Sequence, residues 1–225
     1  MGNFEWVDFY KEFAQKLLEY KNNRKEIIEK IIDVYANADI NLPTLERGNI
    51  VDIDPFTVFG LFNKNKLKAS NRIKIISGLA NAFGVTTAIP ANFASVPTLN
   101  NQNATFYFFV GERDETDIDN LWGLFEAALN YASNPSPVNR DIVCKYFDIV
   151  INKRGNGNSK ITMALYWIAP DVFLNLDSRN EWYIYESGKI PAEIVETLPK
   201  VAKNTKITAQ RYFDIVEALT PYFAK

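Results

Sequence analysis

The chain has 225 residues and a formal net charge of −2 at neutral pH, with 47% of its residues hydrophobic and 14% aromatic. A chain of this length and apolar content can bury a substantial core, as one large domain or two small ones, and is not disordered. The nearly balanced charge excludes a global field that would by itself attract nucleic acid. A nucleic-acid partner therefore has to be met by local patches.

Several kinds of chemistry are excluded by what the sequence lacks. Histidine is absent and Cys144 is the single cysteine, so a His-dependent hydrolytic triad is ruled out and we expect neither a metal site nor another cofactor. The sequence has no GxxxxGK[ST] or GxGxxG motif, and we expect that this stretch is not an enzyme. The lone cysteine, the absence of a long apolar run and the absence of a secretory signal favour a cytoplasmic protein with no membrane partner.

The first part of the chain shows the apolar spacing of helices. Residues 4–35 carry apolar side chains three and four positions apart, which predicts an α-hairpin broken near 21–23. Asp54 followed by Pro55 predicts an N-cap and a first-turn proline, opening a short helix that runs to Phe62.

The middle of the chain changes character after one more helix. Ser70 is predicted to cap that helix, which we expect to stop at Gly84. Residues 85–104 are low in charge and rich in Pro, Asn and Thr, which indicates a long loop or a seam between two lobes. The run TFYFFV at 105–110 suits a strand or a buried helical turn equally well, so at most a minor β element is expected there.

The remaining sequence predicts four further helix starts. These are Asp117, the segment after Pro135-Ser136-Pro137, Asn158 or Ser159 as the cap of a helix that ends before Pro170, and a position near Ala209. The expected fold class is therefore mainly α, a multi-helix globular domain. Its organisation is either a helical lobe at 1–84 and another at 105–225, joined by 85–104, or one continuous domain.

Lysine and arginine collect in three short runs. The first holds Lys64, Lys66, Lys68, Arg72 and Lys74, the second Lys153, Arg154 and Lys160, and the third Lys200, Lys203, Lys206 and Arg211. The second run, NKRGNGNSK, leads into a helix start, where free N–H groups favour a bound oxyanion. The segment 112–119, ERDETDID, is acidic instead, so we expect a bipolar molecule. The alternative is that each run is only a solvated charged face.

Asp177, Ser178, Arg179 and Asn180 follow one another in the stretch between Trp167 and Trp182. They offer carboxylate, hydroxyl, guanidinium and amide groups side by side. Arg179 and Asn180 are candidate contacts to bases or phosphates, and the candidates for stacking on a base or lining its pocket are Trp167, Asp177, Ser178, Trp182 and Tyr183. The structural alternative is that Asp177 or Ser178 caps a helix while Trp122 and Trp167 lie in the core.

Five stretches of the sequence carry a resemblance to a known family. FYKEFAQKLLEY, IVDIDPFTVFGLFNK, RIKIISGLANAFG, DIDNLWGLFEAALNY and ITMALYWIAPDVFLNLDSRN together resemble the N-terminal region of McrB-like AAA+ NTP-dependent restriction proteins, over nearly the whole chain. The resemblance implies an anti-phage DNA-recognition domain, often one that reads modified DNA. It also implies an NTPase module beyond residue 225, a GTPase or ATPase, that forms a homo-oligomer and recruits a McrC-like nuclease. Because the N-terminal domains of this group have unrelated folds, no binding residue is carried over.

The expected function is thus binding of duplex DNA, with a modified or flipped base read near Asp177. The residues expected to contact the nucleic acid are Lys64, Lys66, Lys68, Arg72, Lys153, Arg154, Lys160, Arg179 and Asn180. One alternative is a protein-interaction or regulatory domain of an anti-phage AAA+ protein, which docks through the acidic segment 112–119. The other is a helical glycosylase-like enzyme with Asp177 as its carboxylate.

Overall fold

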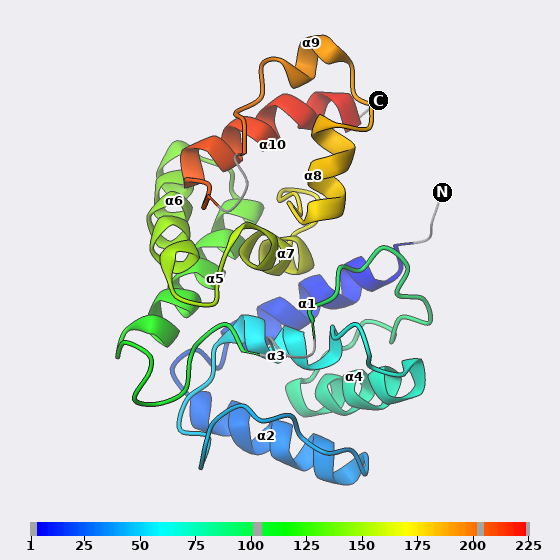
Figure 1. Cartoon of the computed structure of the whole chain (residues 1–225). Helices are drawn as coiled ribbons and strands as arrows, with labels where there is room; N and C mark the ends of the chain where they lie inside the picture. Colours follow the sequence, from blue (N-terminus) through cyan, green and yellow to red (C-terminus); the bar gives the residue numbers. More distant parts are fainter. Residues whose placement is uncertain (1–3, 101–104, 202–204, 224–225) are drawn as a thin grey trace.

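The computed structural model describes residues 4–100, 105–201 and 205–223, and within these ranges it contains ten α-helices and no strand (Figure 1). The mainly α fold class is therefore confirmed. The β structure of these ranges is one isolated parallel bridge between Lys64 and Leu99. The segment 105–110 is irregular, neither strand nor helix.

The helices follow one another with connections of very different length. In chain order they are α1 (Trp6–Leu18), α2 (Arg24–Asn37), α3 (Pro55–Phe62), α4 (Ala69–Phe83), α5 (Asp117–Ser133), α6 (Pro137–Asn152), α7 (Asn158–Ile168), α8 (Ser178–Tyr185), α9 (Ala192–Val195) and α10 (Ala209–Phe223). In Figure 1, α2 and α4 occupy the lower part of the molecule, α5 and α6 lie side by side on the left, and α8, α9 and α10 form the upper part.

Several predicted helix ends are confirmed by the hydrogen bonds that form them. Asp54 Oδ1 accepts from the N–H of Phe56 at 2.8 Å and of Thr57 at 3.0 Å, and Pro55 stands in the first turn of α3. Gly84 ends α4 with a φ of 69°, in the left-handed region where glycine is favoured. The predicted starts of α5, α6 and α10 also agree with the structure.

Two predicted caps were wrong. The helix α4 begins at Ala69, with Lys68 as an N-cap that makes no side-chain hydrogen bond, so Ser70 lies inside the first turn. The helix α7 has Gly157 as its N-cap. The Asn158 side chain turns away to the segment before α10, where it accepts from the N–H of Ile207 at 2.9 Å. A tertiary contact therefore uses the group that the sequence suggested as a cap.

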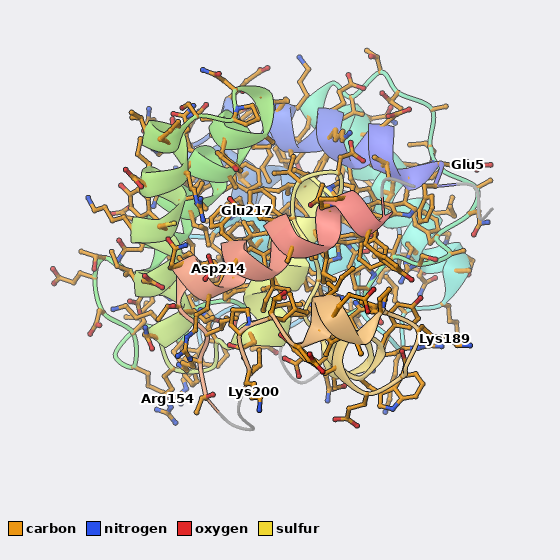
Figure 2. All side chains as sticks on the ribbon, turned by 90° about the horizontal axis from the view of Figure 1, so that it is seen from above. Glu5, Arg154, Lys189, Lys200, Asp214 and Glu217 are labelled. Carbon is orange, nitrogen blue, oxygen red and sulfur yellow. The ribbon has the colours of Figure 1, made fainter. Side chains whose placement is uncertain are left out.

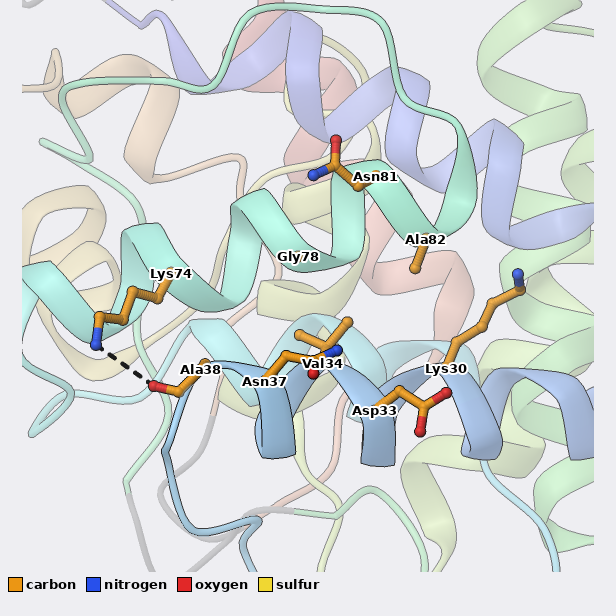
Figure 3. A pocket seen from close by; sticks show the side chains of 9 residues that line it. All are labelled: Lys30, Asp33, Val34, Asn37, Ala38, Lys74, Gly78, Asn81 and Ala82. Atoms are coloured by element: carbon orange, nitrogen blue, oxygen red, sulfur yellow. Dashed lines mark hydrogen bonds between the residues drawn. The ribbon is translucent and has the colours of Figure 1, made fainter.

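The two opening helices exist and are broken near 21–23 as predicted, but α2 packs chiefly on α4, while α1 packs on α7 and α4. The approach of α2 to α4 is close, since a Cβ added to Gly78 would lie 2.6 Å from Val34 Cγ1. A groove of about 680 Å³ runs along this contact, and Lys74 Nζ donates across it to the carbonyl of Ala38 at 3.4 Å (Figure 3).

The buried side chains of 1–84 and of 105–225 form one hydrophobic cluster. The rings of Phe59 and Trp167 stack across the two halves with their centroids 6.3 Å apart. Trp122 and Trp167 are fully buried, and their indole N–H groups donate to the carbonyls of Ile53 and Pro97, both at 2.9 Å. Trp167 is therefore a core residue, as the structural alternative held, and no base can stack on it.

In the ranges that the structure covers, no helix combines the length and the apolar character needed to cross a membrane.

Candidate nucleic-acid interface

The first basic run lies at the connection between α3 and α4 and is exposed only in part. Lys64 is 8% exposed, and burial lowers its pKa to about 8. Arg72 lies with its guanidinium carbon 5.0 Å from the ring centroid of Phe93. Lys66 and Lys68 are exposed. Because the Lys64 side chain is buried, it is not accessible to a phosphate and does not belong to the proposed interface.

The second basic run lies against the acidic segment 112–119 instead of apart from it. Lys153 Nζ is 2.6 Å from Asp114 and 2.7 Å from Asp117, and these hydrogen bonds raise the pKa of the lysine. Arg154 Nη1 lies 4.0 Å from Glu112. The expectation of a bipolar molecule was therefore wrong here, because the segments of opposite charge meet and pair.

A cavity of about 330 Å³ where 105–112 meets the α6–α7 connection is lined by Arg47, Lys160, Phe108 and Phe109, and Arg154 and Phe106 lie against members of this lining. The guanidinium carbon of Arg154 lies 4.5 Å from the ring centroid of Phe108, and that of Arg47 lies 5.7 Å from Phe109. Lys160 Nζ lies 4.8 Å from the ring of Phe106. We call these six residues, Arg47, Arg154, Lys160, Phe106, Phe108 and Phe109, the cation–aromatic cluster.

Glu112 is the acidic side chain that lines this cavity, and it accepts from the Arg47 guanidinium while also facing Arg154. An anionic group thus already occupies the space between two arginines. Both arginine side chains are largely exposed, and Figure 2 shows Arg154 at the edge of the molecule. A phosphate that displaces the carboxylate would find two guanidinium groups in place.

Lys160 supplies the third positive charge from the first turn of α7. Its Nζ donates to the carbonyl of Thr105 at 2.6 Å and to that of Gly155 at 3.3 Å, and an ammonium has one more N–H to offer. Burial lowers the pKa of Lys160 to about 8, although the carboxylate of Asp54 opposes the shift. Part of the charge of Lys160 is therefore lost just above neutral pH.

The Asp177 turn is a helix cap. Asp177 Oδ1 accepts from the N–H of Arg179 at 3.1 Å and of Asn180 at 2.9 Å, while its Oδ2 accepts from Asn175 Nδ2 at 2.8 Å. Asn180 Nδ2 donates to the Asn175 carbonyl at 2.9 Å. Arg179 is exposed. The capping alternative is confirmed for Asp177, and both of its oxygens accept hydrogen bonds.

The helix α8 stands between two cavities. One of about 700 Å³ is lined by Asn158, Ser178, Trp182 and Lys200, which brings the second basic run, the third basic run and the Asp177 turn together. Its other charged lining residues are Glu181, Glu186 and Glu196, so these runs do not form a cationic trough there. The second cavity, of about 270 Å³, takes Asn180 and Tyr183 into its lining.

The rest of the third basic run is spread over the surface near α10. Lys206 Nζ donates to the carbonyl of Lys153 at 3.2 Å, which places it beside the second run. Arg211 is exposed on α10, and Lys203 lies outside the described residues. The first run, at the start of α4, lies on the opposite side of the view from the α6–α7 connection (Figure 1).

Sequence reasoning missed Arg47, Phe108 and Phe109 as members of one site. Arg47 lies in an irregular segment, away from the three basic runs. On sequence alone, the run TFYFFV at 105–110 is interpreted only as a strand or a helical turn. The available signal was the density of aromatic residues in a segment bounded by Thr105 and Gly111, but only the fold brings an arginine to each ring. Among the residues described, no group of three or more His, Cys, Asp or Glu side chains is arranged to hold a metal ion.

The chain belongs to the family described as a domain of unknown function, DUF8425, whose model matches residues 6–224. No curated protein and no solved structure matches the chain significantly. The matched range includes the whole cation–aromatic cluster, so this cluster is part of the family domain. The family description assigns no activity, and the function is therefore argued from the site itself.

Proposed function

We propose that this domain recognises DNA, as the specificity module of a McrB-like restriction system, and that duplex phosphates contact the cation–aromatic cluster. The observation that carries the proposal is that Arg47 and Lys160 line one cavity while Arg154 lies over Phe108 of the same lining, each cation against an aromatic ring. Arginine pairs with phosphate through two parallel hydrogen bonds, and the half-buried rings of Phe108 and Phe109 support the two guanidinium groups. Lys206 adds a charge next to the second run.

The acidic side chains beside the cation–aromatic cluster reduce the positive charge that is available to bind DNA. Lys153 is held by Asp114 and Asp117, so the positive charge that the cation–aromatic cluster itself offers to DNA comes from Arg47, Arg154 and Lys160. Few phosphate contacts give a shallow salt dependence. We therefore expect weak binding by this domain alone, and tighter binding when an NTPase module assembles several copies on one duplex.

The test is the affinity for a labelled duplex, measured by fluorescence anisotropy over a range of salt concentrations. We expect log affinity to fall with log salt, and Arg47→Ala or Arg154→Ala each to reduce the slope by about one. Lys25→Ala is the matched control, because Lys25 is an exposed lysine on α2 with one 3.7 Å pair to Glu29. A slope near zero for the unaltered domain, or equal effects of all three substitutions, rejects the proposal.

The assignment to a restriction system is tested separately in the full-length protein. We expect hydrolysis of GTP or ATP that a bound duplex stimulates, and cleavage of DNA when a McrC-like nuclease is added. Comparing methylated with unmethylated duplexes then shows whether modification is read. If duplex DNA does not change the rate of hydrolysis, this domain does not control the NTPase module.

A second candidate function, docking of a partner protein, is favoured by the cavity between α8 and α9. Trp182 is 53% exposed there, next to Glu181, Glu186 and Glu196. An exposed tryptophan surrounded by carboxylates suits an arginine or lysine side chain of a basic peptide. Charge reversal at Glu186 and Glu196 that abolishes defence while duplex binding persists would favour this function. The glycosylase-like alternative has no comparable support, because Asp177 Oδ1 caps α8 and its Oδ2 accepts from the Asn175 side chain.

A further inference from the structure

Two arginines of the cation–aromatic cluster converge on one carboxylate. Arg47 Nη2 donates to Glu112 Oε1, and Arg154 Nη1 lies 4.0 Å from Glu112 Oε2. The two oxygens belong to the same small group, so both guanidinium groups reach a single position beside the cavity. The carboxylate therefore marks the place where one anion can be held between the two arginines.

Both guanidinium groups are accessible, and an aromatic ring supports each of them. The side chains of Arg47 and Arg154 are 69% and 76% exposed. Arg47 lies over Phe109 and Arg154 over Phe108, and both rings are half-buried. Because each ring carries a guanidinium on one face, its role here is to hold the arginine. Recognition at this cavity therefore rests on charge.

Lys160 adds a third positive charge at the wall of the same cavity. Its Nζ donates to the carbonyls of Thr105 and Gly155, which fixes the position of the ammonium and leaves one N–H for a ligand. The carboxylate of Asp54, which acts on Lys160, is fully buried and does not line the cavity. The charges that line or border the cavity are thus three cations and one carboxylate.

This resident carboxylate decides which kind of phosphate binds. The side chain of Glu112 is 29% exposed and lies on an irregular segment, so a rotation of the side chain opens the position between the arginines. A phosphodiester has one negative charge, as the carboxylate has, and replacing one by the other adds none. A phosphate monoester has about 1.5 to 2 negative charges at pH 7 and three acceptor oxygens. The monoester therefore adds negative charge where three cations meet, and the diester does not.

The size of the cavity favours the same kind of phosphate. Its volume of about 330 Å³ is near the lower end of the range for ligand sites, roughly 300–1,000 Å³. A phosphate and the sugar that carries it fit such a volume, whereas the continuous backbone of a duplex can touch only the rim. A terminal phosphate can enter because it carries a sugar on one side only.

We propose that this cavity binds a terminal phosphate, a monoester such as the 5′-phosphate of a DNA strand or of a free nucleotide, in preference to the phosphodiesters of a continuous backbone. The proposal rests on the function proposed above, because it uses the same cluster and names the class of phosphate that the cluster selects. Backbone phosphates then contact the two exposed arginines at the rim. A strand end and a nucleotide present the same monoester, and the test distinguishes them.

The test uses fluorescence anisotropy of internally labelled duplexes of one sequence. One duplex has 5′-phosphate ends, another has 5′-hydroxyl ends, and a third is closed at both ends by hairpin loops. We expect the first to bind about fivefold or more tightly than the other two. Thymidine 5′-monophosphate should compete with it, and the methyl ester of that nucleotide, which is a diester, should compete about fivefold less well or worse.

The source of the phosphate follows from the same titrations. A phosphorylated duplex that binds much more tightly than thymidine 5′-monophosphate identifies a strand end as the ligand. Equal affinities identify a free nucleotide. Both results uphold the preference for a monoester.

Two variants and a control assign the preference to this cavity. Arg154→Ala alters a largely exposed side chain and should fold, and it should reduce the preference for phosphorylated ends to about twofold or less. Lys25→Ala, the exposed control on α2, should keep the full preference. Glu112→Gln removes the resident charge, so it should bind the methyl ester about as tightly as the unaltered domain binds the monophosphate.

The proposal is overturned if the monophosphate and its methyl ester bind the unaltered domain alike, or if Arg154→Ala keeps the same preference as Lys25→Ala. It is also overturned if the methyl ester gains nothing in Glu112→Gln. Equal and salt-dependent binding of all three duplexes rejects the terminal phosphate and leaves the function proposed above intact. Selective binding of the monophosphate by a domain that binds no duplex upholds this site and rejects that function.

Discussion

Arg113 Nη1 lies 2.8 Å from Glu46 Oε2, in a pair whose side chains are 10% and 5% exposed. The same carboxylate accepts from the N–H of Val110 at 3.0 Å and of Arg47 at 3.1 Å. Arg113 also donates to the carbonyl of Phe108 at 3.0 Å. One buried ion pair therefore joins two irregular segments and sets Arg47 beside the rings at 108–109.

Replacing Arg113 by Met should lower the free energy of unfolding by about 3 kcal/mol or more, because it leaves the Glu46 carboxylate buried without its counter-charge. Urea denaturation measures the loss. Arg47→Met is the control, since the Arg47–Glu112 pair is exposed on the arginine side and should contribute about 1 kcal/mol or less. Equal losses in the two variants would mean that the buried pair does not hold the segment.

Glu112→Gln should strengthen duplex binding several-fold. The carboxylate now occupies the space between Arg47 and Arg154, and a neutral amide would compete less with a phosphate. Anisotropy at fixed salt measures the change. Glu19→Gln, which removes an exposed carboxylate of a 3.4 Å pair with Lys16, controls for the change in net charge. Unchanged affinity in Glu112→Gln would place the phosphate elsewhere.

Duplex affinity should fall between pH 7 and pH 9. Burial holds the pKa of Lys160 at about 8, so the ammonium loses its proton, and hence its attraction for phosphate, as the pH rises through that value. Lys160→Arg keeps its charge throughout this range and should bind with little dependence on pH. The comparison is made by anisotropy at constant ionic strength. A parallel decline in both proteins would show that another group titrates.

The lowered pKa of Lys160 also makes stability depend on pH. Rising pH weakens duplex binding, but it should stabilise the folded state. A lysine whose folded pKa lies near 8 and whose unfolded pKa is 10.5 binds fewer protons when folded, so its contribution makes the folded state more stable as the pH rises from about 8 to about 10. Lys160→Met should remove this contribution from the pH profile of the free energy of unfolding, measured by urea denaturation. A profile identical to that of the unaltered protein would contradict it.

Gly155→Ala should destabilise the fold and weaken duplex binding. Its φ of 79° costs an alanine about 1–2 kcal/mol, and an added Cβ would lie 2.6 Å from Phe108 Cε2 and push the ring that Arg154 covers. Gly157→Ala is the matched control, since its Cβ would meet nothing within 4 Å and its backbone is extended. Thermal denaturation and anisotropy measure both effects, and similar behaviour of the two variants would contradict the expectation.

Asp177→Ala should cost about 1 kcal/mol of stability, because it removes the N-cap of α8. Asp177→Asn keeps an acceptor for the two N–H groups and should lose less. Urea denaturation compares the two. If Asp177 were catalytic, the unaltered domain would release a base from a damaged duplex and both variants would not; no base release by the unaltered domain would exclude a catalytic role.

The sequence by itself determined the helical class and many helix ends. The three- and four-residue spacing that places α1, α2 and α5, and the caps at Asp54 and Gly84, act within a few residues of where they stand in the chain. Such signals are readable without a fold because the groups that satisfy one another are sequence neighbours. The Asp177 turn belongs to this kind, and the helix cap predicted there as the structural alternative is confirmed.

Only the tertiary structure decided which charged and amide side chains are buried, paired or left without a partner. Lys64 and Lys66 are two residues apart, yet one is buried and the other exposed. Lys153 forms an ion pair with the acidic segment 112–119, which the sequence analysis expected to lie apart from the basic runs. Asn175 Oδ1 accepts no hydrogen bond from the described residues. The physical reason is that burial and ion pairing depend on which distant segments meet, and local spacing carries no information about that meeting.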